Sequence, residues 1–372
     1  MRYVKIGCQF LISPILWMVY FLSGFFLRDR TKILFGTHIS VPAGNILAHY
    51  RDVRRMLGAE YKIYWVVDSN EKVKKYQEIG FLAINKYSYK GILLCLSSQF
   101  YCFSQHVNDI SFAFSRNATK INLWHGTPIK KIERDIETGI YSIRYKYWLL
   151  FKIIQPWVFE RFDKIFCSCL HDCNVFSSAF KLENSQLYKT FSPRLSPLKN
   201  VSFEKNNTIL IAPTFRDDGD FDYGKIIDFI GLSELGKKFS SEIKIKLHPA
   251  DRSIIKIPDT ITNISLVNKD VDFYDLLQET KLLITDYSSV FFDAFSLNLP
   301  VIFYWPDYHD FMKYSREFYL RMEDVCPELI CYDMEELKKL ISYYLVSAQK
   351  IKSELFAPYS ISNNYPYEIY KQ

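Results

Sequence analysis

Glycine is scarce in this sequence, and internal repeats, low-complexity segments and long runs of one charge are missing. Only 13 of the 372 residues are glycine. No segment recurs at a fixed period, which excludes collagen-like and other repetitive proteins. No long run of Lys or Arg and no recognisable nucleic-acid module occurs, so no nucleic-acid partner is predicted. These absences leave an ordinary globular protein with packed cores.

A disulfide framework is also missing. The eight cysteines lack the spacing of disulfide-rich domains, and several stand in apolar runs, where reduced Cys behaves as a small hydrophobic residue. A reducing compartment is therefore expected. Cys167, Cys169, His171 and Cys173 form one cluster of metal-ligand residue types, but no second cluster with ligand spacing accompanies them. We predict no metal site.

Length and charge narrow the class of protein further. A chain of 372 residues with 49% hydrophobic residues can bury two cores, so two domains are expected. The formal net charge of +6 and the pI of about 8.7 favour anionic surroundings, such as phospholipid headgroups or a phosphorylated substrate. The aromatic content of 17% fits large packed interfaces or a membrane-facing surface, with core packing as the ordinary explanation.

The chain begins with a long apolar segment. Residues 6–27 contain no charge, and their apolar part reads FLISPILWMVYFLSGFFL before a charged Arg-Asp-Arg sequence, where a signal peptide would have a cleavage site. The length is near the minimum for a membrane span, while Pro14 and the aromatic residues fit a helix lying in the interface equally well. We expect residues 1–30 to form a membrane-associating helix, either spanning or interfacial. The alternative is a buried core helix.

Short apolar runs then alternate with amphipathic stretches, which is typical of an α/β fold with parallel strands. The first series has strands at 32–36, 61–67, 121–124 and 164–169, and a long helix at 141–162. A segment rich in Pro, Lys and Asn at 192–207 reads as a linker. The second series has strands at 208–212, 242–247, 261–266, 281–284 and 300–304.

This pattern predicts two doubly wound domains, at residues 31–200 and 201–372, that face a central cleft. Open α/β sheets bind ligands at the carboxyl ends of their strands, so candidate residues are sought there. The last helix, at 334–348, could pack back on the N-terminal domain.

The stretch KLLITDYSSVFFDAFSLNLPVIFYW, from Lys281 onward, reads as a strand, a polar turn and a helix. Asp286, Tyr287, Ser288 and Ser289 form the turn. A helix N-terminus leaves unpaired N–H groups and the Ser pair adds two hydroxyls, so the turn is suited to holding a phosphate. The alternative is that Asp286 and Ser288 only cap the helix.

A histidine stands at a predicted strand end in the first domain. The segment INLWHGTPIKKI leads from an apolar strand into His125, followed by Gly126, Thr127 and Lys130. Gly126 allows a tight turn, which would hold His125 at the sheet edge. An imidazole titrates near neutral pH and is the commonest general base, although a structural histidine bonded to a carbonyl is the alternative.

The second domain has candidates at two further strand ends. In EIKIKLHP, alternation along a strand would place Lys244, Lys246 and His248 on one face. In APTFRDD, Arg216 could clamp a phosphate bidentately, while the following carboxylates could orient it, bind a divalent ion or form a solvated turn. The candidate residues here are Lys246, His248, Pro249, Thr214, Arg216 and Asp217.

Four motifs together resemble a known family. LWHGTPIKK, APTFRDD, KLHP and TDYSSVFFDAFSLNLPVIFY occur in the order and approximate spacing of the CDP-glycerol glycerophosphotransferases of teichoic acid and capsule synthesis. The resemblance implies a GT-B fold, with the acceptor side in the first domain and the CDP-donor side in the second. It also implies transfer of glycerol phosphate or ribitol phosphate from CDP-glycerol or CDP-ribitol to a hydroxyl of a lipid-linked or growing cell-surface glycan, with release of CMP.

The resemblance carries over to individual residues. His125 and His248 match the family's two functional histidines, and Ser288 and Ser289 match its donor-phosphate contacts. Which histidine is the base stays open, with His125 favoured because its domain should receive the acceptor. The resemblance implies no cofactor with certainty, and whether a divalent cation takes part stays open. The expected location is the cytoplasmic face of the cell membrane. The chain departs from many relatives before the linker, where only Pro-Arg of a longer motif is kept.

Two other functions compete with this one. A GT-B glycosyltransferase resembling polysialyltransferases would use a similar His-Pro pair and Ser pair on a CMP- or UDP-sugar. A non-catalytic scaffold of a polysaccharide synthase complex would keep the fold without the chemistry. Substrate competition and replacement of the two histidines separate these alternatives.

Overall fold

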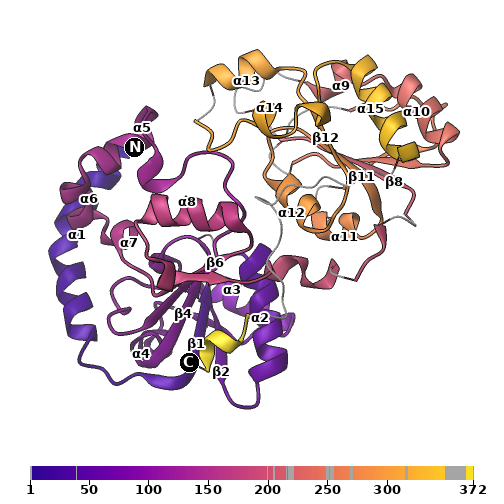
Figure 1. The fold of residues 1–372 in the computed structure, drawn as a ribbon. Helices are drawn as coiled ribbons and strands as arrows, with labels where there is room; N and C mark the ends of the chain where they lie inside the picture. The colour runs from indigo at the N-terminus through magenta and orange to yellow at the C-terminus, as the bar shows by residue number, and fades with distance from the viewer. Residues whose placement is uncertain are drawn as a thin grey trace. The chain divides into compact units, whose positions relative to one another are not determined.

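The structure, a computed structural model, divides into two compact units (Figure 1). It describes residues 2–38, 40–198, 200–203, 206–214, 216, 222–248, 251, 255–268, 271–314, 317–347 and 366–371. Of these, residues 2–126, 132–196 and 366–371 belong to the first unit, and residues 127–131 and 197–347 to the second. The principal boundary falls between Ser196 and Pro197, inside the segment expected to be a linker.

The first unit is built on a seven-stranded sheet in which all neighbouring strands pair in parallel. Its strands are β1 (Asp29–Gly36), β2 (Lys62–Val67), β3 (Ala83–Asn85), β4 (Ser98–Phe103), β5 (Thr119–Asn122), β6 (Lys164–Cys167) and β7 (Leu187–Lys189), in the order β3-β2-β1-β4-β5-β6-β7. The connecting helices include α2 (Gly44–Leu57), α3 (Asn70–Glu78), α4 (Tyr89–Ser97) and α8 (Leu170–Phe180). The strand order reverses between β1 and β4, which makes a topological switch point.

The second unit repeats this order in a six-stranded parallel sheet. Its strands are β8 (Thr208–Ala212), β9 (Glu242–Ile245), β10 (Ile264–Leu266), β11 (Thr280–Thr285), β12 (Val301–Tyr304) and β13 (Ile330–Cys331), in the order β10-β9-β8-β11-β12-β13. Its helices are α9 (Tyr223–Ile226), α10 (Phe229–Lys238), α11 (Phe273–Leu277), α12 (Val290–Ser296), α13 (Tyr308–Tyr314), α14 (Met322–Val325) and α15 (Met334–Ser347). The predicted α/β class with doubly wound parallel sheets is therefore confirmed.

The central strands explain why the apolar runs in the sequence were informative. All five residues of β8 are buried, and Ile33, Leu34 and Phe35 of β1 are fully buried. A parallel strand covered by helices on both faces must be apolar on both faces, so it reads as a continuous hydrophobic run.

The predicted long helix at 141–162 is wrong in one respect, because the chain breaks it twice. It forms α5 (Gly139–Lys146), α6 (Trp148–Ile154) and α7 (Pro156–Phe159). Tyr147 has non-helical angles (φ −106°, ψ 42°), and so does Gln155 (φ −132°, ψ 59°). Gln155 precedes Pro156, whose ring disfavours the helical conformation of the residue before it.

The N-terminal apolar segment forms α1 (Arg2–Ser23), which packs beside α6 (Figure 1). Trp17 Nε1 donates to the carbonyl of Ile153 at 3.1 Å, and the ring of Tyr20 stacks on Phe112 with centroids 4.5 Å apart. Among the helices that the structure describes, none is long and apolar enough to cross a membrane. The expectation of a spanning helix is therefore not supported.

The buried-helix alternative is also wrong, because the outward faces of α1, α5 and α6 are apolar and exposed. We call these residues the apolar surface. They are Phe10, Leu11, Ile12, Ile15, Met18, Phe21, Leu22, Ile140, Tyr141, Ile143, Tyr147, Trp148, Leu149, Leu150 and Ile153.

The C-terminal end of the chain lies in the first unit. Tyr370 lies in the core of this unit, where its hydroxyl is 2.9 Å from His49 Nε2 and 3.0 Å from Cys102 Sγ. The two ends of the chain thus stabilise the same unit. Helix α15 packs on β12 and β13 of the second unit, and its packing on the N-terminal domain stays a prediction.

The buried His49 gives a pH dependence of stability. Complete burial lowers the pKa of His49 to about 3, so the folded protein keeps it neutral while the unfolded chain protonates it below about pH 6.5. The unfolded state then binds more protons, and stability is lost as the pH falls, by about 1.4 kcal/mol per pH unit until the folded pKa is reached. Above pH 6.5 the contribution is fully present.

This dependence can be measured by urea denaturation of the full chain and of His49→Gln between pH 7 and pH 4. We expect the difference in unfolding free energy between the two proteins to shrink as the pH falls. A difference that stays constant over this range would show that His49 does not titrate on unfolding. His309→Gln, an exposed histidine of the second unit, is the control and should leave the slope unchanged.

Candidate active site

In each sheet, neighbouring parallel strands bring the segments that follow them to the same edge. In the second sheet, β8 and β11 are neighbours, and the segments that follow them contain Thr214 and Asp286. In the first sheet, β4 and β5 are neighbours, and their carboxyl ends lead to Ser104 and His125. The fold therefore explains why distant motifs share a sheet edge.

His125 is held in a strained turn after β5. Trp124 has a φ of +48°, unusual for a residue with a large side chain, and Gly126 has a φ of 154°. The backbone N–H of Trp124 donates to Asn122 Oδ1 at 2.8 Å, and its ring packs edge-on against Phe180. This packing fixes Trp124, and with it the turn that carries His125.

The hydrogen-bond partner of His125 shows which of its ring nitrogens carries the proton. Nδ1 lies 3.3 Å from the backbone carbonyl oxygen of Ser104. A carbonyl only accepts, so Nδ1 carries the proton and Nε2 keeps its lone pair. The surrounding protein lowers the pKa of His125 by desolvation, although the residue itself is exposed, and the bond to Ser104 opposes this change. At neutral pH His125 is thus a neutral imidazole whose Nε2 has no hydrogen-bond partner among the described residues, which is the state that a general base needs.

Asp109 orders the loop that fixes this tautomer. The buried Oδ2 of Asp109 accepts from Ser104 N at 3.1 Å, Ser104 Oγ at 3.1 Å and Gln105 N at 2.9 Å. Asn122 Nδ2 donates to the carbonyl of Gln105 at 3.1 Å and joins the loop to β5. Asp109 lies in no motif and Asn122 immediately precedes LWHGTPIKK, and the sequence analysis proposed neither as a site residue.

Arg194 holds the backbone of the same turn. Its Nη1 donates to the carbonyl of His125 at 2.8 Å, and its backbone N–H donates to Asn45 Oδ1 at 3.3 Å, which also accepts from Ser192 Oγ at 2.8 Å. Arg194 belongs to the Pro-Arg pair that the chain keeps before the linker. That pair was the only sequence signal for a residue that positions His125.

Removing the charge of Asp109 should misplace the ring of His125, although the two side chains are not bonded to each other. In Asp109→Asn an amide replaces an acceptor of three bonds, so the Ser104 carbonyl shifts, and a misplacement of about 1 Å at a catalytic group costs about 10²-fold in rate. We expect kcat to fall by this order with the KM for donor unchanged. Asp163→Asn is the control, because Asp163 Oδ2 accepts from Lys120 N at 2.7 Å at the opposite end of β5. Equal losses of kcat in both variants would contradict a positioning role.

Asp286 connects the segments that follow β8 and β11, the switch point of the second sheet. It is 1% exposed, and its Oδ1 accepts from Thr214 N at 2.8 Å and Tyr287 N at 2.7 Å. Its Oδ2 accepts from Arg216 Nη2 at 2.9 Å and from the hydroxyl of Tyr223. These four contacts hold the turn after β11 against the segment after β8.

Arg216 also binds a carboxylate of the second unit, that of Asp307. Its Nε and Nη2 bind the carboxylate of Asp307 at 2.6 Å and 3.0 Å, and its guanidinium carbon lies 5.1 Å from the ring centroid of Tyr287 and 4.8 Å from that of Phe311. Tyr287 and Phe311 stack with centroids 3.6 Å apart. Asp307 thus binds two of the donors with which Arg216 would clamp a phosphate, and the bidentate clamp stays a prediction. The predicted residue Asp217 lies outside the described residues.

The segment after Gly126 belongs to the second unit and brings Lys130 to this cluster. Lys130 pairs with Phe318 in an antiparallel bridge, and Lys131 N donates to the carbonyl of Glu317 at 2.7 Å. Lys130 Nζ lies 4.7 Å from the ring centroid of Phe311. Thr127 is buried in this segment. Lys130, Arg216 and Tyr287, predicted from three motifs, therefore surround one aromatic ring.

The Ser pair divides its roles. Ser288 Oγ accepts from the backbone N–H of Val290 at 3.4 Å, so it caps the first turn of α12. Ser289 is the N-cap residue but makes no side-chain capping bond, and the part of the chain that the structure describes offers its hydroxyl no partner. The capping alternative therefore accounts for Ser288, while the phosphate contact stays a prediction for Ser289.

Lys246 and His248 follow β9, which ends earlier than expected. Lys246 is buried and its Nζ donates to the carbonyl of Asn268 at 3.0 Å, whereas Lys244 Nζ bonds Glu279 at 2.7 Å. His248 is exposed. Since β9 ends at Ile245, strand alternation does not reach His248. The predicted residue Pro249 lies outside the described residues.

No three His, Cys, Asp or Glu side chains in the described ranges are arranged to hold a metal ion. Cys167, Cys169 and Cys173 are buried and form no disulfide within the described residues, and a hydrogen bond with Cys173 together with burial raises the pKa of Cys167.

Comparisons with known proteins identify similar chains. A family model described as CDP-glycerol:poly(glycerophosphate) glycerophosphotransferase matches residues 20–365. The chain is 26% identical over 301 residues to the teichoic acid poly(glycerol phosphate) polymerase of Bacillus subtilis (strain 168), covering 74% of this chain and 39% of that protein. It is 27% identical over 296 residues to the teichoic acid glycerol-phosphate primase of the same strain, covering 74% and 73%.

A ribitol-phosphate relative is similar to the same degree. The teichoic acid ribitol-phosphate polymerase TarL of Staphylococcus aureus (strain NCTC 8325 / PS 47) is 24% identical over 336 residues, covering 84% of this chain and 57% of that protein. Among solved structures, a variant of the wall teichoic acid polymerase TagF has a TM-score of 0.68 at 19% identity, covering 92% of this chain and 89% of that chain. A TagF structure soaked with CDPG has a TM-score of 0.62 at 19% identity, covering 86% and 82%. These structures establish the fold.

Proposed function

The chain belongs to the CDP-glycerol:poly(glycerophosphate) glycerophosphotransferase family, and from this premise we propose that it transfers glycerol phosphate or ribitol phosphate from a CDP-activated donor. The acceptor is a hydroxyl of a lipid-linked or growing cell-surface glycan, and CMP is released. Family membership confirms the resemblance of the four motifs. The observation that carries the proposal is their position, because all of them lie in or beside the segments that follow parallel strands.

The proposed chemistry is a direct displacement. The acceptor oxygen attacks the phosphorus that bears the polyol, the bond from this phosphorus to the oxygen of CMP breaks, and the hydroxyl proton passes to Nε2 of His125. Phosphoryl transfer requires in-line positioning and neutralisation of negative charge more than covalent catalysis. Ser289, the first N–H groups of α12 and His248 would contact the phosphates, and Lys130 and Lys246 would add positive charge.

The acceptor would reach the enzyme at the cytoplasmic face of a membrane. Supporting this, the apolar surface of α1, α5 and α6 is exposed to water in the isolated chain, and exposed apolar patches of this kind mark interaction or membrane sites. Helix α1 would lie in the interface plane, with its apolar face toward the acyl chains.

A donor screen tests the reaction. The purified full chain is incubated with CDP-glycerol, CDP-ribitol, CMP-sugars or UDP-sugars and a lipid-linked acceptor, and release of CMP or UDP is measured. We expect CMP release with one polyol donor only. Turnover with a nucleotide sugar alone would instead support the glycosyltransferase alternative, and no turnover with any donor and several acceptors would overturn the proposal.

A further inference from the structure

Three histidines follow neighbouring strands at one edge of the first sheet. His38 comes after β1, His106 after β4 and His125 after β5, and these three strands are consecutive in the sheet. Burial lowers the pKa of His106 and the charge of His38 adds to this effect, which places the two rings near each other. Open α/β sheets bind ligands at such a switch point. The displacement proposed above uses only His125 of the three.

Glu133 brings a carboxylate to this edge from a backbone conformation that side chains rarely adopt. Its φ is +48°, in the left-handed region that favours glycine. Such strain persists only where the surrounding structure holds it, and it is found mainly at functional positions. The short helical turn Glu133–Asp135 packs on α8, where Asp135 Oδ1 accepts from Ser178 Oγ at 2.8 Å. This anchor holds Glu133 in its strained position.

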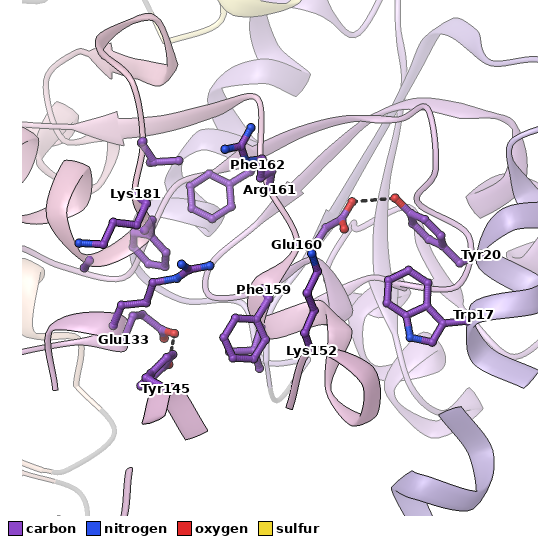
Figure 2. A pocket seen from close by; sticks show the side chains of 15 residues that line it. Trp17, Tyr20, Glu133, Tyr145, Lys152, Phe159, Glu160, Arg161, Phe162 and Lys181 are labelled. Atoms are coloured by element: carbon purple, nitrogen blue, oxygen red, sulfur yellow. Dashed lines mark hydrogen bonds between the residues drawn. The ribbon is translucent and has the colours of Figure 1, made fainter. Parts of the chain in front are cut away.

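The two carboxylate oxygens of Glu133 have different surroundings. Oε2 accepts from the hydroxyl of Tyr145 (Figure 2). Among the residues that the structure describes, the polar atom nearest to Oε1 is His106 Nε2, at 3.6 Å, which is too long for a hydrogen bond. The side chains of Glu133 and His106 are only 10% and 12% exposed, and buried acceptors are rarely left unpaired. Oε1 can therefore accept a further donor.

A ligand can reach this carboxylate, because Glu133 and Tyr145 both line a cavity of about 540 Å³ in the first unit (Figure 2). The gap between Glu133 Oε1 and His106 Nε2 has the size of one hydroxyl group. The facing carboxylate favours the tautomer of His106 with its proton on Nε2. An oxygen atom about 2.8 Å from both atoms could accept from His106 and donate to Glu133. A hydroxyl does both, whereas an ionised phosphate oxygen only accepts and would be repelled by the carboxylate.

This gap lies beside the proposed base. His106 is two residues after Ser104, whose carbonyl binds Nδ1 of His125, and two residues span at most about 7 Å. Burial lowers the pKa of His125, and the charge of Glu133 opposes this change while that of His106 adds to it. A base must be within hydrogen-bond reach of the hydroxyl that it deprotonates. A hydroxyl in the gap and the attacking hydroxyl can therefore belong to one small polyol.

We propose that Glu133 and His106 bind a second hydroxyl of the acceptor, next to the hydroxyl that attacks, so that the acceptor ends in a vicinal diol. Glu133 Oε1 accepts the proton of this second hydroxyl, and His106 Nε2 donates to its oxygen. No covalent bond changes at this site, and its effect is to orient the acceptor toward His125. The polyol of the donor also has vicinal hydroxyls, but the hydroxyl that His125 deprotonates belongs to the acceptor. The site rests on the proposed function and specifies the class of its acceptor.

Two soluble acceptors that differ by one hydroxyl test this site. Octyl 2,3-dihydroxypropyl phosphate ends in a vicinal diol, and octyl 3-hydroxypropyl phosphate lacks the neighbouring hydroxyl. CMP release with the polyol donor, at varied acceptor concentration, gives kcat/KM for each. A hydrogen bond to a charged group contributes about 10- to 100-fold, so the natural chain should prefer the diol by this factor. Equal kcat/KM for the two acceptors would show that water fills the gap and would overturn the proposal.

Two variants of Glu133 should lose the preference for the diol. Glu133→Gln keeps the shape of the side chain but not its charge, so its preference should fall to about twofold to tenfold. Glu133→Gly removes the carboxylate and also relieves the strained φ, so it should stay folded and show no preference. A glutamate with only a structural role would lower kcat/KM for both acceptors by the same factor. An unchanged preference in both variants would therefore overturn the proposal.

Glu160→Gln is the matched control. Like Glu133, Glu160 accepts from a tyrosine hydroxyl, that of Tyr20 at 2.9 Å (Figure 2), and its side chain is 17% exposed. It pairs with Lys120 Nζ at 3.0 Å, and Lys120 lies in the first half of β5, away from the end that leads to His125. Glu160→Gln should keep the full preference for the diol. A loss equal to that of Glu133→Gln would show that the preference does not depend on this site.

The choice of acceptors separates this site from the transfer reaction. Turnover with a lipid-linked acceptor but none with the diol would overturn the diol site and leave the transfer reaction in place. A change in Glu133→Gln that is confined to the KM for the CDP donor would assign the bound hydroxyl to the donor and overturn the acceptor site. No CMP release with any acceptor would overturn the transfer reaction itself.

Discussion

Replacing His125 with alanine should lower kcat by about 10²–10⁴-fold, the usual contribution of a general base, while the thermal unfolding temperature stays that of the natural chain. The ring of His125 is exposed and one ring bond, from Nδ1 to Ser104, is described, so little stability depends on it. The loss should therefore be in the chemical step. CMP release and thermal unfolding of the same preparations provide the measurement.

The pH profile distinguishes His125 from His248. Desolvation lowers the pKa of His125, so the acid limb of kcat/KM should lie below about pH 6.5, with activity lost as the pH falls and the imidazole becomes protonated. His125→Ala should abolish this limb. His248→Ala should keep it and raise the KM for the CDP donor, because His248 belongs to the second unit.

His309→Ala is the control, since His309 is an exposed histidine of α13 outside the four motifs, and it should leave both parameters unchanged. If His248→Ala removes the acid limb and His125→Ala keeps it, the two histidines exchange roles. If both variants unfold at markedly lower temperature, they are structural and the non-catalytic scaffold regains support.

The elements best predicted from the sequence are those that are buried on both faces, because such elements must be apolar throughout. The strand expected at 208–212 is β8 (Thr208–Ala212) without change, because its five buried residues form an unbroken apolar run. The helix expected after the turn of Asp286 to Ser289 is α12 (Val290–Ser296). Such elements are specified by local sequence, and parallel sheets place their carboxyl ends together whatever the loops contain.

The features that the sequence did not reveal depend on contacts between distant residues. Nothing near Arg216 in the sequence shows that Asp307, 91 positions away, would occupy its donors. The same holds for Asp109, which acts on His125 through a carbonyl, and for Tyr370, which fills the first core from the far end of the chain. Side-chain roles at the site are therefore set by tertiary packing, although residue types and strand ends can be read from the sequence.

Replacing Asp286 should strongly destabilise the second unit. Asp286 and Arg216 are both buried, with side chains 1% and 6% exposed. Removing one partner of a buried ion pair leaves an uncompensated charge and costs about 3–5 kcal/mol. In Asp286→Ala, Arg216 keeps Asp307, while Thr214 N and the hydroxyl of Tyr223 lose their acceptor. We expect a loss toward the lower end of that range, measured by urea denaturation of the full chain.

The isosteric variant Asp286→Asn separates charge from shape. Its amide group presents donors to Arg216 and Tyr223, so it should destabilise the unit nearly as much as alanine does. Glu279→Gln is the control, because Glu279 pairs with Lys244 at 2.7 Å with a side chain 49% exposed, and exposed pairs contribute about 0–1 kcal/mol. Equal, small effects of Asp286→Asn and Glu279→Gln would refute a structural role for the network. Asp286 also orients the turn before Ser288 and Ser289. The fraction of Asp286→Asn that stays folded should therefore show a raised KM for the CDP donor. An unchanged KM would show that this turn does not contact the donor phosphates.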